Sequence, residues 1–220
     1  MFEAHLAGRV VEVGAGRGTF SAKLSAIDAI DELILVEPDL GMHGDLGVRF
    51  ADNPRVSTHH GYFGDHDLGG EVDAIVLVNV LEHIEDDADL VASALAALRP
   101  GGALLLFVPA GPWLYGSLDE EFEHFRRYTR SQLNELLTSG GLSPEDVYYV
   151  NAPGMLAWFV AGRLLRQRTV RTGQMKLYDR LVIPFVSRLE AILRPPRGQS
   201  LTAIAIRPPA NAVPGSEENS

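Results

Sequence analysis

Short apolar runs alternate with stretches of helical spacing along the first part of the chain. The β-branched residues at positions 10, 11 and 13 predict a strand that ends at Gly14, and the apolar spacing from Phe20 to Ile27 predicts a helix. A continuous apolar run from Leu33 to Val36 predicts a second strand, covered on both faces. Together these elements form the strand, helix and strand of a parallel βαβ unit.

The same alternation continues through the middle of the chain. Val72 to Val80 and Ala103 to Val108 predict two further strands, and the apolar spacing from Asp87 to Leu98 predicts the helix between them. We expect Arg99 to Gly102 to stop this helix and to turn the chain into the next strand, because proline and glycine do not continue a helix. The alternation predicts a doubly wound α/β domain with a parallel sheet and helices on both faces.

A long helical insertion, residues 151–200, precedes the last strand. Its candidate helices run from Met155 to Leu165 and from Tyr178 to Leu193. One domain would then span residues 1–207, and residues 208–220 would form a disordered tail, because their composition cannot bury enough apolar area. The elements expected around the insertion are a helix from Arg130 to Ser139 and strands from Val147 to Val150 and from Leu201 to Ile206.

Composition narrows the class of protein. The 220 residues include no cysteine, which excludes a disulfide framework, thiolate metal sites and thiol nucleophiles. The formal net charge of −10 argues against non-specific binding of nucleic acid. The longest apolar stretch, Ala152 to Gly162, is shorter than the roughly 20 residues of a membrane span, and no leader of the secretory type is evident. We therefore expect a cytoplasmic protein without a transmembrane span.

The most informative motif is a glycine turn that reads EVGAGRGT from Glu12 to Thr19. Its three glycines allow positive φ angles and let a ligand approach backbone amides at the positive end of the next helix. The dinucleotide fingerprint needs a glycine where Thr19 stands. Glu37, about 20 residues beyond the turn, is placed to accept the hydroxyls of an unphosphorylated ribose. The alternative is that the glycines only make a tight connection.

Several segments resemble the class I S-adenosylmethionine-dependent methyltransferase family. They are Val11 to Thr19 with Glu37, Asp73 to His83 and Leu98 to Pro109, and the resemblance covers about residues 9–150. It implies a Rossmann-like methyltransferase fold with a seven-stranded, mostly parallel sheet. It also implies an enzyme that uses S-adenosyl-L-methionine as cofactor and methylates a small-molecule acceptor.

The resemblance further implies which residues hold the cofactor on the side of the glycine turn. The methionine part would lie against Glu12, Gly14 and Gly16. The ribose would be held by Glu37, and Pro38 would flank the adenine. This places the whole length of the cofactor along one edge of the sheet.

Two further segments are expected at the same edge. Either Tyr62 and Phe63 cover the adenine or Asp65 bonds to it, and Asn79 and Val80 would lie beside the reactive methyl group. The full set of expected cofactor-binding residues is Glu12, Gly14, Ala15, Gly16, Gly18, Glu37, Pro38, Tyr62, Phe63, Asn79 and Val80.

Two histidines are the candidate catalytic residues. The methyl group of a sulfonium is already electrophilic, so the protein has to align and deprotonate the acceptor. His83, which follows Glu82, is the best candidate for a general base because imidazole titrates near neutral pH, and a purely structural histidine is the alternative. His124 is a second candidate for a base or an acceptor-binding group.

A second interpretation of these residues involves a metal. The run from Asn79 to His83 resembles the E-x-x-E-H magnesium motif of small-RNA 2′-O-methyltransferases and ubiquinone-pathway O-methyltransferases, whose further ligand is a later histidine comparable to His124. Mg²⁺ held by Glu82, His83 and His124 would lower the pKa of an acceptor hydroxyl. Asn79 departs from the motif, because a neutral amide attracts a cation less than a carboxylate does.

The insertion leaves the acceptor open. The apolar residues from Trp158 to Leu165, followed by arginines, would contact a membrane surface or an anionic lipid-linked acceptor, or else form a lid or a dimer surface. Among functions, we prefer O-methylation of a sugar, phenol or lipid-linked small molecule. The alternatives are a nicotinamide oxidoreductase and a non-catalytic module that binds the cofactor or a membrane surface.

Overall fold

The computed structural model describes residues 2–65, 68, 70–165, 186, 190 and 193–209. Within them lies one seven-stranded sheet with the strand order β3-β2-β1-β4-β5-β7-β6. All neighbouring strands are parallel except β7, which runs antiparallel to β5 and β6. This architecture confirms the expected doubly wound, mostly parallel sheet. The strands are β1 (Gly8–Val13), β2 (Ile30–Glu37), β3 (Val56–His60), β4 (Val72–Val78), β5 (Leu98–Pro109), β6 (Ser143–Val150) and β7 (Ser200–Ile206).

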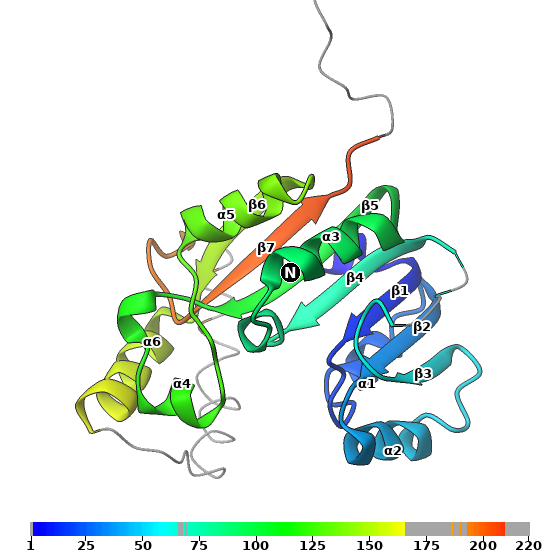
Figure 1. Cartoon of the computed structure of the whole chain (residues 1–220), viewed down its shortest axis with the longest axis horizontal. Coiled ribbons are helices and arrows are strands. Elements are labelled where there is room, and N and C mark those ends of the chain that lie inside the picture. The colour runs from blue at the N-terminus through cyan, green and yellow to red at the C-terminus, as the bar shows by residue number, and fades with distance from the viewer. Residues whose placement is uncertain are drawn as a thin grey trace, which may run out of the picture.

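Helices cover both faces of the sheet, and Figure 1 shows α3 and α5 on the same side of it. Leu90 of α3 and Leu133 of α5 belong to one apolar cluster, whereas Leu24 of α1 and Leu46 of α2 belong to a second cluster. The apolar strand runs are buried between the two clusters, as expected for strands covered on both faces. The α-helices are α1 (Ser21–Leu24), α2 (Leu40–Arg49), α3 (Asp87–Ala97), α4 (Ser117–Glu121), α5 (Arg130–Ser139) and α6 (Ala152–Trp158).

Two expected boundaries are wrong. The first helix spans only four residues and does not reach Ile27, because the Ile27 N–H bonds to the carbonyl of Leu24 in a tighter turn. Strand β5 begins at Leu98 rather than after a turn at residues 99–102. Leu98 pairs with Val72 and Ala103 pairs with Ala74, so the intervening residues bulge out of the pairing. Proline and glycine here interrupt a strand without separating two elements.

Two elements at the β3 edge had no clear signal in the sequence. Strand β3 reads Val-Ser-Thr-His-His and is only partly buried, so it lacks an apolar run. Helix α2 contains three glycines, which weaken a helical pattern, and it depends on Asp39, whose Oδ1 accepts a 2.8 Å hydrogen bond from the N–H of Met42. Sheet pairing and this cap therefore stabilise elements that propensity does not favour.

Part of the insertion is described. Helix α6 continues into a π-helix (Phe159–Leu164), so the helix expected from Met155 to Leu165 is confirmed and begins three residues earlier. The second candidate helix, Tyr178 to Leu193, and the tail beyond residue 209 fall almost wholly outside the described residues. Among the residues that the structure describes, no helix has both the length and the apolar character needed to cross a membrane.

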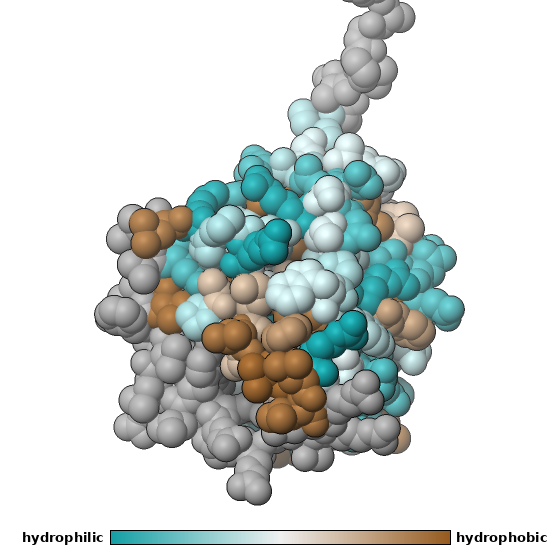
Figure 2. All heavy atoms as spheres, turned by 90° about the vertical axis from the view of Figure 1, so that its left-hand side faces the viewer, coloured by the Kyte–Doolittle hydropathy of each residue, from teal (hydrophilic) through white to brown (hydrophobic). Residues whose placement is uncertain are grey.

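The face that carries α6 is apolar. Figure 2, which views the molecule from the left-hand side of Figure 1, shows hydrophobic side chains gathered there. Leu156, Val160, Leu164 and Leu165 are all exposed, the last two by 62%. Contact of this face with a membrane, a lid or a second subunit stays a prediction.

Candidate functional site

The glycine turn between β1 and α1 has the conformation that the sequence predicts. Gly14, Gly16 and Gly18 have φ angles of +70°, +57° and +77°. A Cβ atom on Gly14 would lie 2.5 Å from a methyl group of Val80, and one on Gly18 would lie 2.9 Å from Leu46. Gly16 instead faces open space, with nothing within 4 Å of a Cβ. The outer glycines are required by packing, and the central one leaves bare backbone to a ligand.

Glu37 lies directly beside this turn. Its Oε2 accepts a 2.7 Å hydrogen bond from the N–H of Gly16, and its Oε1 accepts a 2.9 Å hydrogen bond from the N–H of Asp39. The carbonyl of Pro38 lies 3.0 Å from Nε2 of His60 at the end of β3. The carboxylate expected to hold the ribose is thus fixed at the carboxyl edge of β2 before any ligand arrives.

Glu12, at the end of β1, is the second carboxyl group next to the turn. It is buried, and its Oε2 has no hydrogen-bond partner among the described residues. Burial raises the pKa of Glu12 to about 7, the Ser21 hydroxyl opposes this rise, and the charge of Glu37 adds to it. A buried carboxyl oxygen without a hydrogen-bond partner fits a cationic ligand, and Ala15 is buried in the same turn.

In the segment after β3, the two aromatic residues expected at the adenine differ in their surroundings. Tyr62 is 69% exposed, and its N–H donates to Oδ2 of Asp65, so Asp65 is partly used within this loop. Phe63 instead packs against the apolar cluster beneath α3 and lines a groove with Ser93 and Ala96. Of the two aromatic residues, Tyr62 is the exposed one. Its role, and that of Phe63, stay predictions.

The carboxyl end of β4 meets the glycine turn. Val80 is the residue that packs closest to Gly14. Asn79 adopts a φ of +53°, which is uncommon for a residue other than glycine, and its N–H donates a 2.8 Å hydrogen bond to the carbonyl of Phe107. The structure therefore brings Asn79 and Val80 to the same edge as Glu12 and Glu37, where parallel sheets bind ligands.

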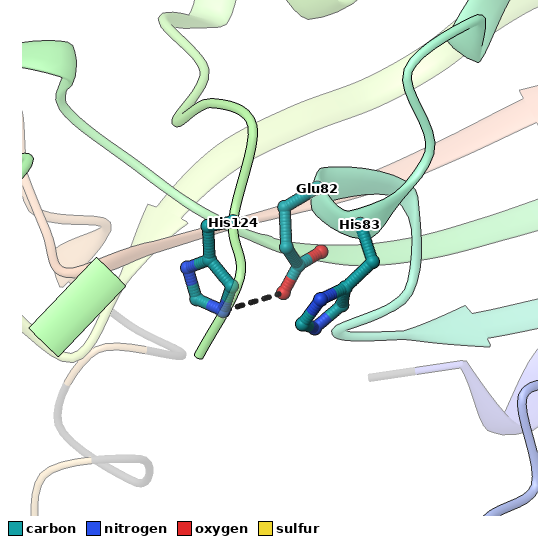
Figure 3. Close-up of side chains that lie close together, drawn as sticks. All are labelled: Glu82, His83 and His124. Atoms are coloured by element: carbon teal, nitrogen blue, oxygen red, sulfur yellow. Dashed lines mark ion pairs between the residues drawn. The ribbon is translucent and has the colours of Figure 1, made fainter. Parts of the chain in front are cut away.

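A short 3₁₀ helix (Leu81–His83) follows and presents a cluster of titratable side chains (Figure 3). One ligand atom from each of Glu82, His83 and His124 lies within 4.8 Å of the others. Oε1 of Glu82 is 4.0 Å from Nε2 of His124, and the rings of the two histidines meet edge to face at 4.8 Å. The sequence analysis grouped these three residues, and the structure brings them together.

Glu82 is fully buried, and neither of its carboxyl oxygens has a partner within the described part of the chain. Burial raises the pKa of Glu82 to about 8, with Arg127 opposing the shift and Asp119 adding to it. Burial and the neighbouring His124 lower the pKa of His83, which is the more exposed histidine. Burial therefore favours the neutral forms of Glu82 and His83.

Asp119 is a site residue that sequence reasoning missed. It is buried and lies 3.0 Å from Nδ1 of His124 and 2.7 Å from Nε of Arg127, which is also buried. In the sequence it stands next to Glu120 and Glu121, and nothing in that acidic run marks which carboxylate is buried. Spacing to His124 was the only available signal.

A family model described as a methyltransferase domain matches residues 2–147 of the chain. The chain belongs to the class I S-adenosylmethionine-dependent methyltransferase family. This assignment decides against the nicotinamide oxidoreductase. The bare backbone at Gly16, with Glu12 and Glu37 on either side, fits the cofactor of this family.

Curated relatives of this methyltransferase agree with the family. It is 33% identical over 144 residues to a protein of Mycolicibacterium smegmatis described as an S-adenosylmethionine-dependent methyltransferase, a match that covers 64% of this chain and 54% of that protein. It is 34% identical over 105 residues to a ubiquinone biosynthesis O-methyltransferase of Aromatoleum aromaticum, which covers 45% of this chain and 43% of that protein. The chain thus spans about half the length of these relatives.

The fold also has solved counterparts. An O-methyltransferase from a polyketide synthase of Brevibacillus brevis, in complex with S-adenosylhomocysteine, aligns with a TM-score of 0.59 at 16% identity. The alignment covers 92% of this chain and 67% of that one. At this identity the likeness concerns the fold alone.

Proposed function

We propose that this methyltransferase transfers the methyl group of S-adenosylmethionine to a hydroxyl oxygen of a small-molecule acceptor. The observation that carries the proposal is the fully buried Glu82 with the partly buried His124 4.0 Å away, beside the edge where the cofactor is expected. A hydroxyl must lose its proton to become a good nucleophile, whereas a neutral amine already carries a lone pair. A histidine base such as His124 is therefore of most use to a hydroxyl substrate.

The cofactor would be held along the carboxyl edge of the sheet. Glu37 would accept the ribose hydroxyls, the bare backbone of Gly16 would allow close approach, and Glu12 would face the cationic end. When bound, the sulfonium supplies an electrophilic methyl group and a neutral leaving group. The protein then has to hold the acceptor oxygen in line with it, and His124 would take the hydroxyl proton at Nε2.

The nature of the acceptor is supported by the surroundings and by a relative. Phe122 lies over the His124 ring with centroids 6.0 Å apart, and it is 43% exposed, so it offers an aromatic surface next to the base. The similarity to ubiquinone biosynthesis O-methyltransferases also favours a phenolic hydroxyl. We therefore propose a phenol or catechol as acceptor class.

The test is methyl transfer from labelled S-adenosylmethionine to a panel of a catechol, a simple phenol, a sugar and a primary amine. The proposal expects label on the oxygen of the catechol or the phenol. It also expects His124→Gln to lower the turnover by on the order of 10²- to 10⁴-fold with unchanged binding of S-adenosylhomocysteine. Label on the amine alone would contradict the proposal.

A second candidate is a metal-assisted version of the same reaction, in which Glu82, His83 and His124 hold a divalent cation. It is favoured by their ligand atoms, all within 4.8 Å of one another, and by the unpartnered oxygens of Glu82. A carboxylate with two imidazoles suits Mn²⁺ or Zn²⁺ at least as well as Mg²⁺, which prefers oxygen ligands. When bound, the cation would lower the pKa of the acceptor hydroxyl.

Calorimetric titration of the protein with Mg²⁺, Mn²⁺ and Zn²⁺ separates the two versions. The metal-assisted version expects one site that Glu82→Gln abolishes, and methyl transfer that stops when the metal is chelated and resumes when it is restored. Full transfer in the presence of a chelator would leave the unassisted version as the mechanism.

A further inference from the structure

Among the described residues, the Asp119 carboxylate has three hydrogen-bond donors and one imidazole nitrogen around it. Oδ1 lies 3.0 Å from Nδ1 of His124 and 2.7 Å from Nε of Arg127. Oδ2 accepts from the N–H of Gly116 at 3.0 Å and from Nε1 of Trp158 at 3.3 Å. The three donors around this fully buried carboxylate fix its orientation and favour its ionised form.

Arg127 keeps this carboxylate ionised. Its guanidinium is buried, donates to Asp119 and to the carbonyl of Ala110, and lies 4.8 Å from the ring of Trp158. An arginine stays protonated in proteins, so a carboxylate paired with it in the interior carries no proton. Asp119 can therefore only accept hydrogen bonds.

This charge decides where the imidazole proton of His124 resides. Since the facing oxygen of Asp119 is an acceptor, Nδ1 has to be the protonated nitrogen. In the neutral ring Nε2 then carries the lone pair, and it points toward Oε1 of Glu82. The opposite tautomer would set a lone pair of Nδ1 against a buried carboxylate.

The His124 ring is also held in place from other sides. The His124 N–H donates to the carbonyl of Asp119 at 2.9 Å, and the His124 carbonyl accepts from the hydroxyl of Tyr115 at 2.7 Å. The rings of Phe122 and His83 lie 6.0 and 4.8 Å from it. These contacts restrict a ring flip that would exchange the two nitrogens.

We propose that Asp119 is a positioning residue: it holds the proton of His124 on Nδ1 and so leaves Nε2 free to receive the proton of the acceptor hydroxyl. The proposal rests on the proposed function for the identity of the proton donor. The protonation of Nδ1 by itself would hold for either version of that function, since a base and a metal ligand both need the lone pair at Nε2. His83 has no such carboxylate partner among the hydrogen bonds of the described residues, so the two histidines are not equivalent.

A purely structural role for Asp119 is the competing explanation, because the same carboxylate accepts from Gly116 at the start of α4. Kinetics separate the two. If Asp119 acts through His124, Asp119→Asn lowers kcat for a catechol acceptor by on the order of 10²-fold or more and leaves the KM and the affinity for S-adenosylhomocysteine nearly unchanged. In a His124→Gln background the same change adds little further loss, whereas independent structural effects would multiply.

The decisive experiment needs no acceptor. Nitrogen-15 imidazole spectra of the full chain, recorded in mildly alkaline buffer where histidine is neutral, report which ring nitrogen carries the proton, and His124→Gln assigns the signal. We expect Nδ1 protonation in the wild type and in Ser117→Ala, which removes a 3.0 Å hydrogen bond from α4 to Gly162 without touching Asp119. We expect the proton to move to Nε2 in Asp119→Asn.

Wild-type protein with the proton on Nε2 overturns the proposal, and so does a folded Asp119→Asn variant that keeps it on Nδ1. If Asp119→Asn does not fold, the wild-type spectrum decides alone. If the protein transfers no methyl group to any hydroxyl, the proposed function fails. The imidazole spectrum still tests whether Asp119 holds the proton of His124 on Nδ1.

Discussion

The N–H of Gly16 donates a 2.7 Å hydrogen bond to Oε2 of Glu37, which ties the bare centre of the glycine turn to the carboxylate that ends β2. Gly16 follows β1 and Glu37 ends the neighbouring parallel strand β2, so this bond sets the spacing between the places expected for the methionine and the ribose of the cofactor. The turn is thus organised before the ligand binds, which limits the entropy lost on binding.

Removal of the Glu37 carboxylate should weaken cofactor binding without unfolding the protein. Glu37→Ala loses two hydrogen bonds that the ribose hydroxyls would donate to the carboxylate, worth about 3 kcal/mol together, or roughly 150-fold in Kd. Calorimetry with S-adenosylhomocysteine measures the change. Glu32→Ala is the matched control, because Glu32 lies on the same strand and pairs with Arg9 at the other end. Equal affinities in the two variants would contradict the assignment of Glu37.

The glycines of the turn should separate stability from binding. Gly16→Ala places a Cβ in open space, so it costs about 1–2 kcal/mol of stability from the positive φ, but it fills the space left to the cofactor. Gly14→Ala has the same strain and also overlaps Val80, so it should destabilise more. Urea unfolding and S-adenosylhomocysteine titration of each variant check this order. Normal binding by Gly16→Ala would show that the cofactor does not approach there.

The buried carboxyl group of Glu12 predicts a pH dependence of stability. Its pKa is raised from 4.5 to about 7 in the folded chain, so the folded state binds the proton more tightly than the unfolded state. The resulting stability is fully present below pH 4.5 and is lost as the pH rises through 7, a change of about 3 kcal/mol. Glu12→Gln removes this pH-dependent contribution to the free energy of unfolding.

We would measure the free energy of unfolding of the wild type and of Glu12→Gln between pH 4.5 and 8. The difference between the two proteins isolates the effect of Glu12, because all other titrating groups are the same in both. The wild type should lose stability relative to the variant as the pH rises. Parallel curves for the two proteins would mean that Glu12 ionises normally. Saturating S-adenosylmethionine should flatten the wild-type curve if the cationic cofactor favours the ionised carboxylate.

The buried pair of Arg127 and Asp119 should contribute far more than an exposed pair. Arg127→Met leaves a buried carboxylate without its cation and should cost about 3–5 kcal/mol. Arg17→Met breaks the exposed pair with Asp45 and should cost about 0–1 kcal/mol. Urea unfolding of both variants measures the two losses of stability. A similarly small loss of unfolding free energy in both variants would contradict the prediction.

The sequence predicted the fold where strands are buried on both faces. Leu33 to Val36 form a continuous apolar run because helices cover both sides of β2, and such runs are readable without a structure. Strand β3 could not be predicted from the sequence, because an edge strand pairs on one side, is only partly buried and needs no apolar run. The bulge at residues 99–102 could not be predicted either. Proline and glycine indicate an interruption of regular secondary structure, but they do not distinguish a bulge from a turn.

For the candidate site too, local signals could be predicted from the sequence and contacts between distant parts of the chain could not. The glycine turn, Glu12 and Glu37 could be found because their spacing is set by one βαβ unit. Asp119 could not, because its role depends on burial by Arg127 and Trp158 from two other parts of the chain. Phe63 packs beneath α3, and its expected role at the adenine stays a prediction.

A crystal structure of the complex with S-adenosylhomocysteine tests the account most directly. It should place the ribose hydroxyls within hydrogen-bond distance of Glu37, the amino acid part over Gly16, and the sulfur on the side of Glu82 and His124. A ligand bound elsewhere, or one whose sulfur points away from His124, would contradict the account.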